Sequence, residues 1–304
     1  MKLSLRNIGK IDDASVEIEG ITVIAGENNT GKSTVGRVLF SVFHGFFDIE
    51  GQIKRECVQS VGHLIDVIYG AVTNRLTSRV DTRRIAQDVM EQRDLFKNDI
   101  GAIKNGIIKS IIQYDVNFEK HLENTDIDEM ILRIQELLNI SDSEIFQSIL
   151  EKNLMAEFNG QIGNIYSEES GEIRLQIKNE EIVLSIDGNN VTKIEGGASL
   201  HTEAIYLDNP FVLDEIYYTF GKYGKNPMNT NHRIYLENRL IHDKEETNIV
   251  EEIVVNKKFE NIYNKIAMVC AGDIIRNGKG ELGYKKKHSD KVLDVRNVSA
   301  GLKM

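Results

Sequence analysis

The stretch Gly26-Glu-Asn-Asn-Thr-Gly-Lys-Ser33 decides the fold, because it is a complete Walker A pattern, Gly-x-x-x-x-Gly-Lys-Ser. Its glycines allow positive φ angles and close backbone approach, so successive amides can form a nest for anions. A helix that begins here would add its N-terminal partial charge at the same point. Lys32 is therefore expected to reach the β- and γ-phosphates, and the Ser33 hydroxyl to ligate Mg²⁺. The predicted nucleotide-binding residues are Gly26, Asn29, Thr30, Gly31, Lys32, Ser33 and Thr34.

The segments on either side of this loop fit the same interpretation. Ile21–Ala25 is a nearly continuous apolar run, which predicts a strand buried on both faces. Thr34–Phe47 follows the loop with apolar residues at helical spacing. Nearer the N-terminus, apolar and polar residues alternate around positions 3–5 and 16–18, which predicts two half-buried strands. The sequence thus places the loop between a buried strand and an amphipathic helix.

The rest of the chain divides into a helical part and a part with hairpins. Residues 50–154 are predicted to be helical, with one apolar stripe over Thr125–Ile140. Ser141-Asp-Ser-Glu144 is a capping box that opens the next helix. Alternating apolar residues predict a hairpin at 173–186 and a second one at 281–298.

The composition of the chain excludes some classes of function and location. The 304 residues carry a formal net charge of −10, which argues against a general polyanion binder. Tyr284-Lys-Lys-Lys-His288 is a local basic cluster, whose simplest interpretation is a solvated hairpin tip. The alternative is contact with DNA, RNA or the acidic surface of a partner. No apolar run has the ~18–20 residues of a membrane span, and the N-terminus has no signal-peptide pattern. With two distant cysteines as well, the expected location is the cytoplasm, without a membrane partner.

The acidic groups that ATP hydrolysis requires are harder to find. The only apolar run that ends in an acid at a predicted strand end is Ala204-Ile-Tyr-Leu-Asp208. Asn209 follows it where a catalytic glutamate is expected, so Asp208 is either a degenerate Walker B residue or has another role. The guanine-reading pattern Asn-Lys-x-Asp does not occur, which argues against a GTPase.

Three N-terminal segments together resemble the ATPase head of a known family. They are Leu3–Gly9, Val16–Ile18 and Ile24–Thr34, and they are similar to ABC-type AAA ATPases of the RecF/SMC/OLD group. Such proteins are often found in bacterial antiphage-defence and DNA-repair systems. The resemblance implies an α/β P-loop NTPase fold of the ABC-head type, with an inserted helical lobe and β-hairpins, and ATP and Mg²⁺ as cofactors.

Near the other end, Asn297-Val-Ser-Ala-Gly-Leu-Lys303 resembles the signature motif of that family. The resemblance implies a homodimer of ATP-bound heads, in which Ser299 and Gly301 of one protomer contact the γ-phosphate held by the other. In the family the Walker B strand and catalytic glutamate follow the signature, so this chain is expected to stop before them. That order also puts Asp208 at the Q-loop position, for which Gln161 is another candidate.

The resemblance divides the chain into three parts. Residues 1–49 would be the N-terminal part of the head with the P-loop, and 50–157 a helical insertion. Residues 158–304 would hold the β-hairpin, the Q-loop-like strand and a helical lobe that ends at the signature motif.

The leading functional expectation is an ATP-binding head whose ATP-dependent dimerisation controls a DNA-directed or nuclease effector function, with ATP hydrolysis by the full-length dimer. One alternative is a non-catalytic ATP-sensing module that holds a nuclease or effector partner. A second alternative is a self-sufficient P-loop ATPase or kinase that uses Asp208 as its Walker B residue.

Overall fold

The protein has a mixed α/β architecture with two antiparallel sheets in its described parts. The computed structural model describes residues 1–28, 30–74, 80–122, 125–197, 199–209, 232–236, 257, 260, 264–265, 272–276, 282–294 and 297–298. Every strand pairing within the two sheets is antiparallel, and the parallel sheet of a P-loop fold is not among these strands. An isolated parallel bridge joins Phe47 to Leu200.

The larger sheet has five strands in the order β2-β1-β3-β4-β5. Its strands are β1 (Lys2–Ile8), β2 (Ile11–Glu17), β3 (Gly171–Ile177), β4 (Glu180–Asp187) and β5 (Asn190–Gly196). Alternation puts apolar residues on one face: Leu3 lies opposite Leu175, and Leu175 lies opposite Ile182 in the next pair. The strands predicted around residues 3–5 and 16–18 and the hairpin predicted at 173–186 are confirmed.

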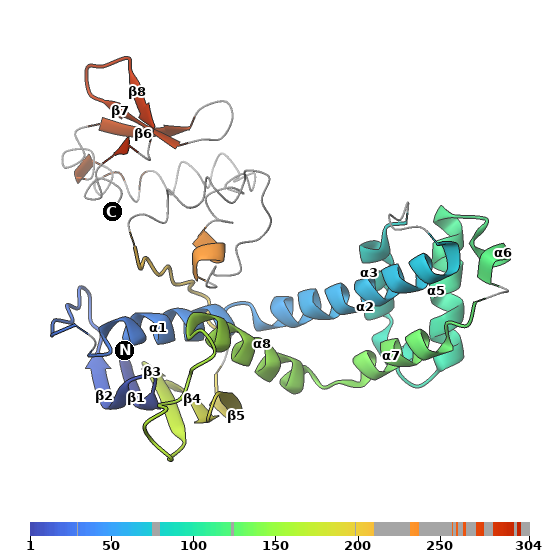
Figure 1. Cartoon of the computed structure of the whole chain (residues 1–304), viewed down its shortest axis with the longest axis horizontal. Helices are drawn as coiled ribbons and strands as arrows, with labels where there is room; N and C mark the ends of the chain where they lie inside the picture. Colours follow the sequence, from blue (N-terminus) through green and yellow to red (C-terminus); the bar gives the residue numbers. More distant parts are fainter. Residues whose placement is uncertain are drawn as a thin grey trace.

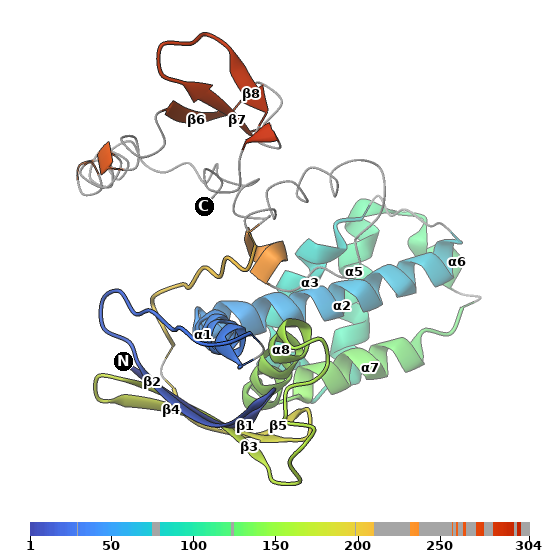
Figure 2. The ribbon, with the colours of Figure 1, turned by 60° about the vertical axis from the view of Figure 1, so that its left-hand side comes forward.

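Two helices cover the apolar face of this sheet. They are α1 (Lys32–Phe46) and α8 (Asp142–Glu157), which lie side by side above the strands in Figure 2. Val38 and Phe46 of α1 and Leu154 of α8 are fully buried in the resulting core. Each such side chain contributes about 1.5–3 kcal/mol by leaving water, so this core fixes α1, and with it the Walker A loop, to the sheet.

A separate helical lobe extends away from the sheet (Figure 1). Besides α8, which links it to the sheet, its helices are α2 (Ile49–Thr73), α3 (Thr82–Glu91), α4 (Arg93–Phe96), α5 (Ile100–Tyr114), α6 (Phe118–Leu122) and α7 (Asp128–Asn139). The lobe has a second hydrophobic core, which the predicted stripe of α7 enters through Ile131, Ile134 and Leu138. The predicted helices and the capping box of Ser141 and Glu144 are confirmed. Among the described helices, none is both long enough and apolar enough to cross a lipid bilayer.

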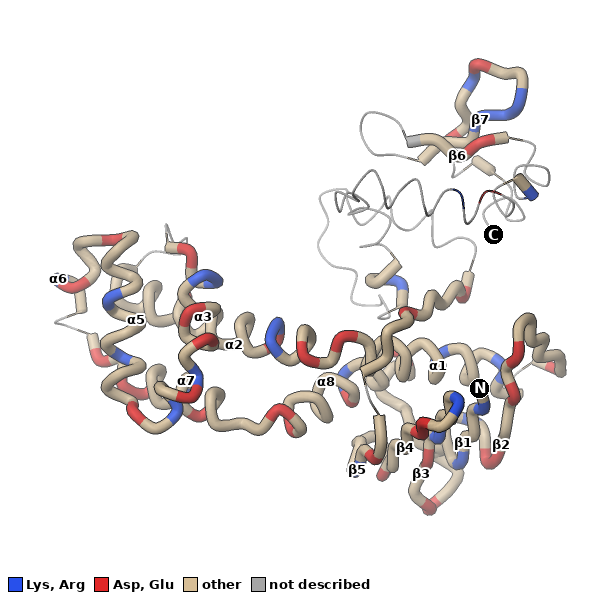
Figure 3. The backbone as a smooth tube through the Cα atoms, turned by 180° about the vertical axis from the view of Figure 1, so that it is seen from behind, with Lys and Arg blue, Asp and Glu red and all other residues tan. Residues whose placement is uncertain are grey.

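The smaller sheet has three described strands. They are β6 (Gly272–Arg276), β7 (Leu282–Lys286) and β8 (Val292–Asp294), in the order β6-β7-β8. The pairing of β7 with β8 confirms the predicted second hairpin. Lys and Arg residues gather at the end of β7 and on the loop that follows it (Figure 3). The Nζ atom of Lys285, in β7, lies 3.8 Å from Asp290 Oδ1.

The prediction of a buried strand at Ile21–Ala25 is wrong. The segment is not a strand, and Ile21 and Val23 are 96% and 83% exposed. Gly20, at a φ angle of 57°, turns the chain after β2, and among the described residues no strand runs alongside this segment. The strand predicted at Ala204–Asp208 is also absent, and Ile205 and Leu207 are largely exposed. Both runs are apolar enough to form strands, but a strand requires a neighbour that accepts its hydrogen bonds.

Candidate functional site

The Walker A loop leads directly into the first turn of α1. Gly31 takes a left-handed conformation with φ 85°, and α1 begins at Lys32. No side chain caps this end of the helix, so its first amides are available to an anion. The side chain of Ile11 lies against Gly31, where a Cβ atom would be 2.6 Å from Ile11 Cγ1. Glycine is thus required here both for the φ angle and for the close contact with β2.

The Lys32 side chain folds back over the loop. Its Nζ atom donates to the carbonyl oxygen of Gly26 at 2.9 Å and to that of Glu27. The Thr30 hydroxyl donates to the same Glu27 carbonyl at 2.9 Å. The loop is thus closed by its own polar groups, with an ammonium group beside the start of α1. Asn29, also predicted to bind nucleotide, lies outside the described residues.

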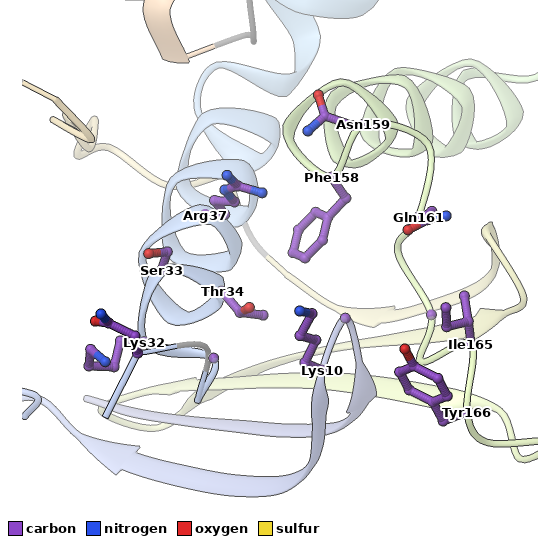
Figure 4. A pocket seen from close by; sticks show the side chains of 14 residues that line it. Lys10, Lys32, Ser33, Thr34, Arg37, Phe158, Asn159, Gln161, Ile165 and Tyr166 are labelled. Atoms are coloured by element: carbon purple, nitrogen blue, oxygen red, sulfur yellow. The ribbon is translucent and has the colours of Figure 1, made fainter. Parts of the chain in front are cut away.

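A pocket of about 500 Å³ adjoins the loop. This volume lies within the range of roughly 300–1,000 Å³ that is typical of small-molecule sites. One wall is formed by the loop and α1, the floor by Gly9 and Lys10 in the β1–β2 turn, and the opposite wall by segment 158–166 (Figure 4). Gly31, Lys32, Ser33 and Thr34 are among the predicted residues that line it.

The charge of this pocket is positive. Lys10, Lys32 and Arg37 line it, and among the described residues no Asp or Glu does. The Arg37 Nε atom is buried and has no hydrogen-bond partner among the described residues. A buried donor without an acceptor is costly, and the guanidinium group still contributes its positive charge to the pocket that Arg37 lines. In a chain with a net charge of −10, this local excess of cations makes the pocket electrostatically favourable for an anion.

The site fits Mg²⁺ only together with phosphates. Ser33 is exposed at the pocket and can supply one hydroxyl ligand. Within the described ranges no group of three or more His, Cys, Asp or Glu side chains is arranged to hold a metal ion. Mg²⁺ in proteins usually keeps several waters and takes few protein ligands beside substrate phosphates, so one hydroxyl is compatible with a phosphate-borne ion.

Asp208 does not line the pocket but belongs to a separate polar cluster, in which His232 and Glu157 are buried. Its Oδ2 atom accepts from Arg233 Nη2 at 2.7 Å, and its Oδ1 atom lies 3.3 Å from His232 Nε2. Burial raises the pKa of the Asp208 carboxyl, but the hydrogen bonds and charges of Arg233 and His232 outweigh burial and hold this pKa below its ordinary value. Gln161, the other residue considered for the Q-loop, does line the pocket. Ser299 and Gly301 lie outside the described residues.

His232 connects Asp208 to the last residue of α8. Its Nδ1 atom lies 2.7 Å from Glu157 Oε2, and its backbone N–H donates to Glu157 Oε1 at 2.6 Å. Glu157 is fully buried and His232 is 2% exposed. Because Glu157 directly precedes Phe158, this cluster holds the end of α8 from which the opposite pocket wall starts.

Replacing Glu157 with glutamine is expected to lower the free energy of unfolding by about 1–2 kcal/mol, because the buried amide keeps only one acceptor for the two bonds. Chemical denaturation measures the change. Glu136→Gln, on the exposed face of α7, is the matched control and should leave the midpoint unchanged. Equal midpoints for the two variants would show that the Glu157–His232 bonds contribute nothing to stability.

Sequence reasoning did not identify Arg37, Glu157 or the wall residues Phe158 and Tyr166. Arg37 had a detectable signal, because it follows Ser33 by one helical turn and so lies on the same face of α1. The others are about 125 or more residues from the loop in sequence and carry no local motif. Only their placement in space brings them to the site.

No protein-family model matches the chain, and neither does any curated protein or solved structure.

Proposed function

We propose that the chain binds Mg·ATP, with the triphosphate held by the loop Gly26–Ser33. The observation that carries this proposal is the composition of the pocket. Lys10, Lys32 and Arg37 line it beside the uncapped start of α1, and no Asp or Glu among the described residues lines it. Lys32 would leave the loop carbonyls for the β- and γ-phosphates, and Ser33 would ligate the Mg²⁺ ion that these phosphates carry. Arg37 would add a further positive charge beside the phosphates.

The proposal includes a P-loop NTPase fold of the ABC-head type. Its support is the complete Walker A sequence, the glycine at φ 85° and the helix that begins at the next residue. An ordinary glycine-rich turn needs none of these features together, and it needs no lysine directed at the turn's own carbonyls.

We further propose that ATP holds two protomers together and that this dimer controls a nuclease, another effector or DNA. The support is the similarity of Asn297–Lys303 to a signature motif, with Ser299 and Gly301 as the residues that would complete the site of the other protomer. Because no described acid lines the pocket, an isolated protomer is expected to bind ATP with slow or no turnover. The same observation favours, as a second candidate, a non-catalytic module that senses ATP for its partner.

Titration calorimetry with Mg·ATP, together with light scattering and a phosphate-release assay, tests the proposal. We expect one saturable site per chain, a doubled mass with ATP and negligible phosphate release. No binding at millimolar ATP would refute the assignment of the loop. Rapid turnover by a monomer would instead refute ATP-dependent dimerisation and favour Asp208 as a Walker B residue, which Asp208→Ala would then confirm by abolishing turnover.

A further inference from the structure

The pocket wall opposite the loop ends in two exposed apolar side chains. Ile165 and Tyr166 are neighbours in sequence, line the pocket, and are 63% and 83% exposed. In Figure 4 they lie at one end of the pocket with Lys32 and Ser33 at the other and Lys10 between them. The pocket thus has a cationic end at the start of α1 and an apolar, aromatic end at this pair.

The backbone that carries this pair is firmly held. The N–H groups of Gly9 and Asn164 donate to the carbonyl oxygens of Ile162 and Asn7 at 2.8 and 2.9 Å, which ties the segment to β1 and the turn after it. The N–H of Gly163 donates to Gly188 in the β4–β5 turn at 3.0 Å. Tyr166 is therefore exposed on a fixed support, not on a loose loop.

Asn164 holds the backbone at Tyr166. The residue is 7% exposed. Its Nδ2 atom donates to Asp12 Oδ1 at 2.7 Å, and its Oδ1 atom accepts from the backbone N–H of Tyr166 at 3.0 Å. These two bonds leave the Tyr166 ring outside the core at the mouth of the pocket. The backbone beneath the ring is therefore held, so a flat ligand that stacks here would have to order only the Tyr166 side chain.

We propose that Ile165 and Tyr166 form the platform for the purine base of the nucleotide whose triphosphate lies at Gly26–Ser33. This inference rests on the proposed function. The base stacks on the aromatic ring and packs against the isoleucine, while Lys10 lies near the ribose and α-phosphate between the two ends. The platform contacts the face of the base and not its edge, so it favours large purines over pyrimidines.

The test compares ATP, CTP and inorganic tripolyphosphate, each with Mg²⁺, by titration calorimetry. Removing one base–aromatic stack weakens binding by about tenfold. We expect Tyr166→Ala to weaken ATP by that factor, to reduce the preference for ATP over CTP, and to leave tripolyphosphate unchanged. Tyr166→Phe should retain the affinity for ATP. Tyr114→Ala, at an exposed tyrosine of the helical lobe, is the matched control and should bind all three ligands like the unaltered protein.

The outcomes separate this inference from the function on which it rests. If neither ATP nor tripolyphosphate binds the unaltered protein, the proposed function and the base platform both fail. If both bind, and Tyr166→Ala changes neither affinity or weakens both equally, the triphosphate site stands and the platform is refuted. Because the Tyr166 side chain is 83% exposed, its removal leaves the core intact, and an unchanged unfolding midpoint verifies this.

Discussion

Replacing Lys32 with alanine is expected to weaken Mg·ATP binding by about 100-fold and to leave the fold intact. Charged hydrogen bonds to phosphate contribute roughly 1.5–3 kcal/mol each, and a factor of 100 corresponds to about 2.7 kcal/mol. No other described residue of the loop carries a positive charge, while Lys10 and Arg37 come from outside it. The loss should therefore be large, and the two remaining cations should not replace it.

The same substitution should have little effect on stability. The hydrogen bonds of Lys32 Nζ go to Gly26 and Glu27, two carbonyls of its own exposed loop. Calorimetry gives the affinity and chemical denaturation the unfolding midpoint for each variant. Lys109→Ala, at an exposed lysine of α5 in the helical lobe, is the matched control. Unchanged ATP affinity in Lys32→Ala would show that the loop does not hold the triphosphate.

The elements that could be predicted from sequence are those whose pattern is local. In the β3–β4 hairpin, a period of two puts Ile173 opposite Leu184 and Leu175 opposite Ile182 on the face that α1 and α8 cover. In α7 a helical period does the same for Ile134. These periods are properties of a single segment, so they can be detected without knowledge of the rest of the fold.

The strand predicted at Ile21–Ala25 was wrong because strand formation also depends on a neighbouring strand, which the sequence of the segment does not specify. Ile21–Ala25 has the composition of a buried strand, yet its side chains face solvent in the structure. A central parallel strand needs a neighbour on each side, whereas the described strands close an antiparallel sheet without this segment. The hydrophobicity of a segment can indicate that it should be buried, but it does not show whether a neighbouring strand is present to pair with it.

The candidate site was predictable only on the loop side. Positions 26–33 are contiguous, so the pattern reveals them together. The opposite wall depends on contacts such as that between Asn164 and Asp12, which are 152 residues apart. The bond between Glu157 and His232 spans 75 residues. A single sequence carries no signal for such pairs, because each residue taken alone is an ordinary polar side chain.

Replacing Gly31 with alanine is expected to destabilise the protein by about 3 kcal/mol and to abolish ATP binding. A left-handed conformation costs an L-residue about 1–2 kcal/mol, and forcing a methyl group into a packed contact adds about 1–3 kcal/mol. At Gly31 both apply, because φ is 85° and the added Cβ would lie 2.6 Å from Ile11 Cγ1. Relief of either strain would move the loop away from the first amides of α1.

Gly160→Ala separates the two contributions. Gly160 has a φ angle of 80°, but an added Cβ would meet nothing within 4 Å, so only the conformational cost of about 1–2 kcal/mol applies. Chemical denaturation of both variants should therefore show a larger loss for Gly31→Ala. Equal losses would mean that the contact with Ile11 contributes nothing.

The double variant Ile11→Ala, Gly31→Ala then identifies the source of the extra cost. Ile11 is 7% exposed and belongs to the sheet core, so its truncation is destabilising by itself. If the two residues collide as the distance predicts, the double variant should lose less stability than the sum of the single variants, by about 1–3 kcal/mol. Because Ile11 belongs to β2 and Gly31 precedes α1, such coupling would mean that the antiparallel sheet directly sets the position of the phosphate-binding loop. Additive losses would leave the φ angle as the sole requirement for glycine at this position.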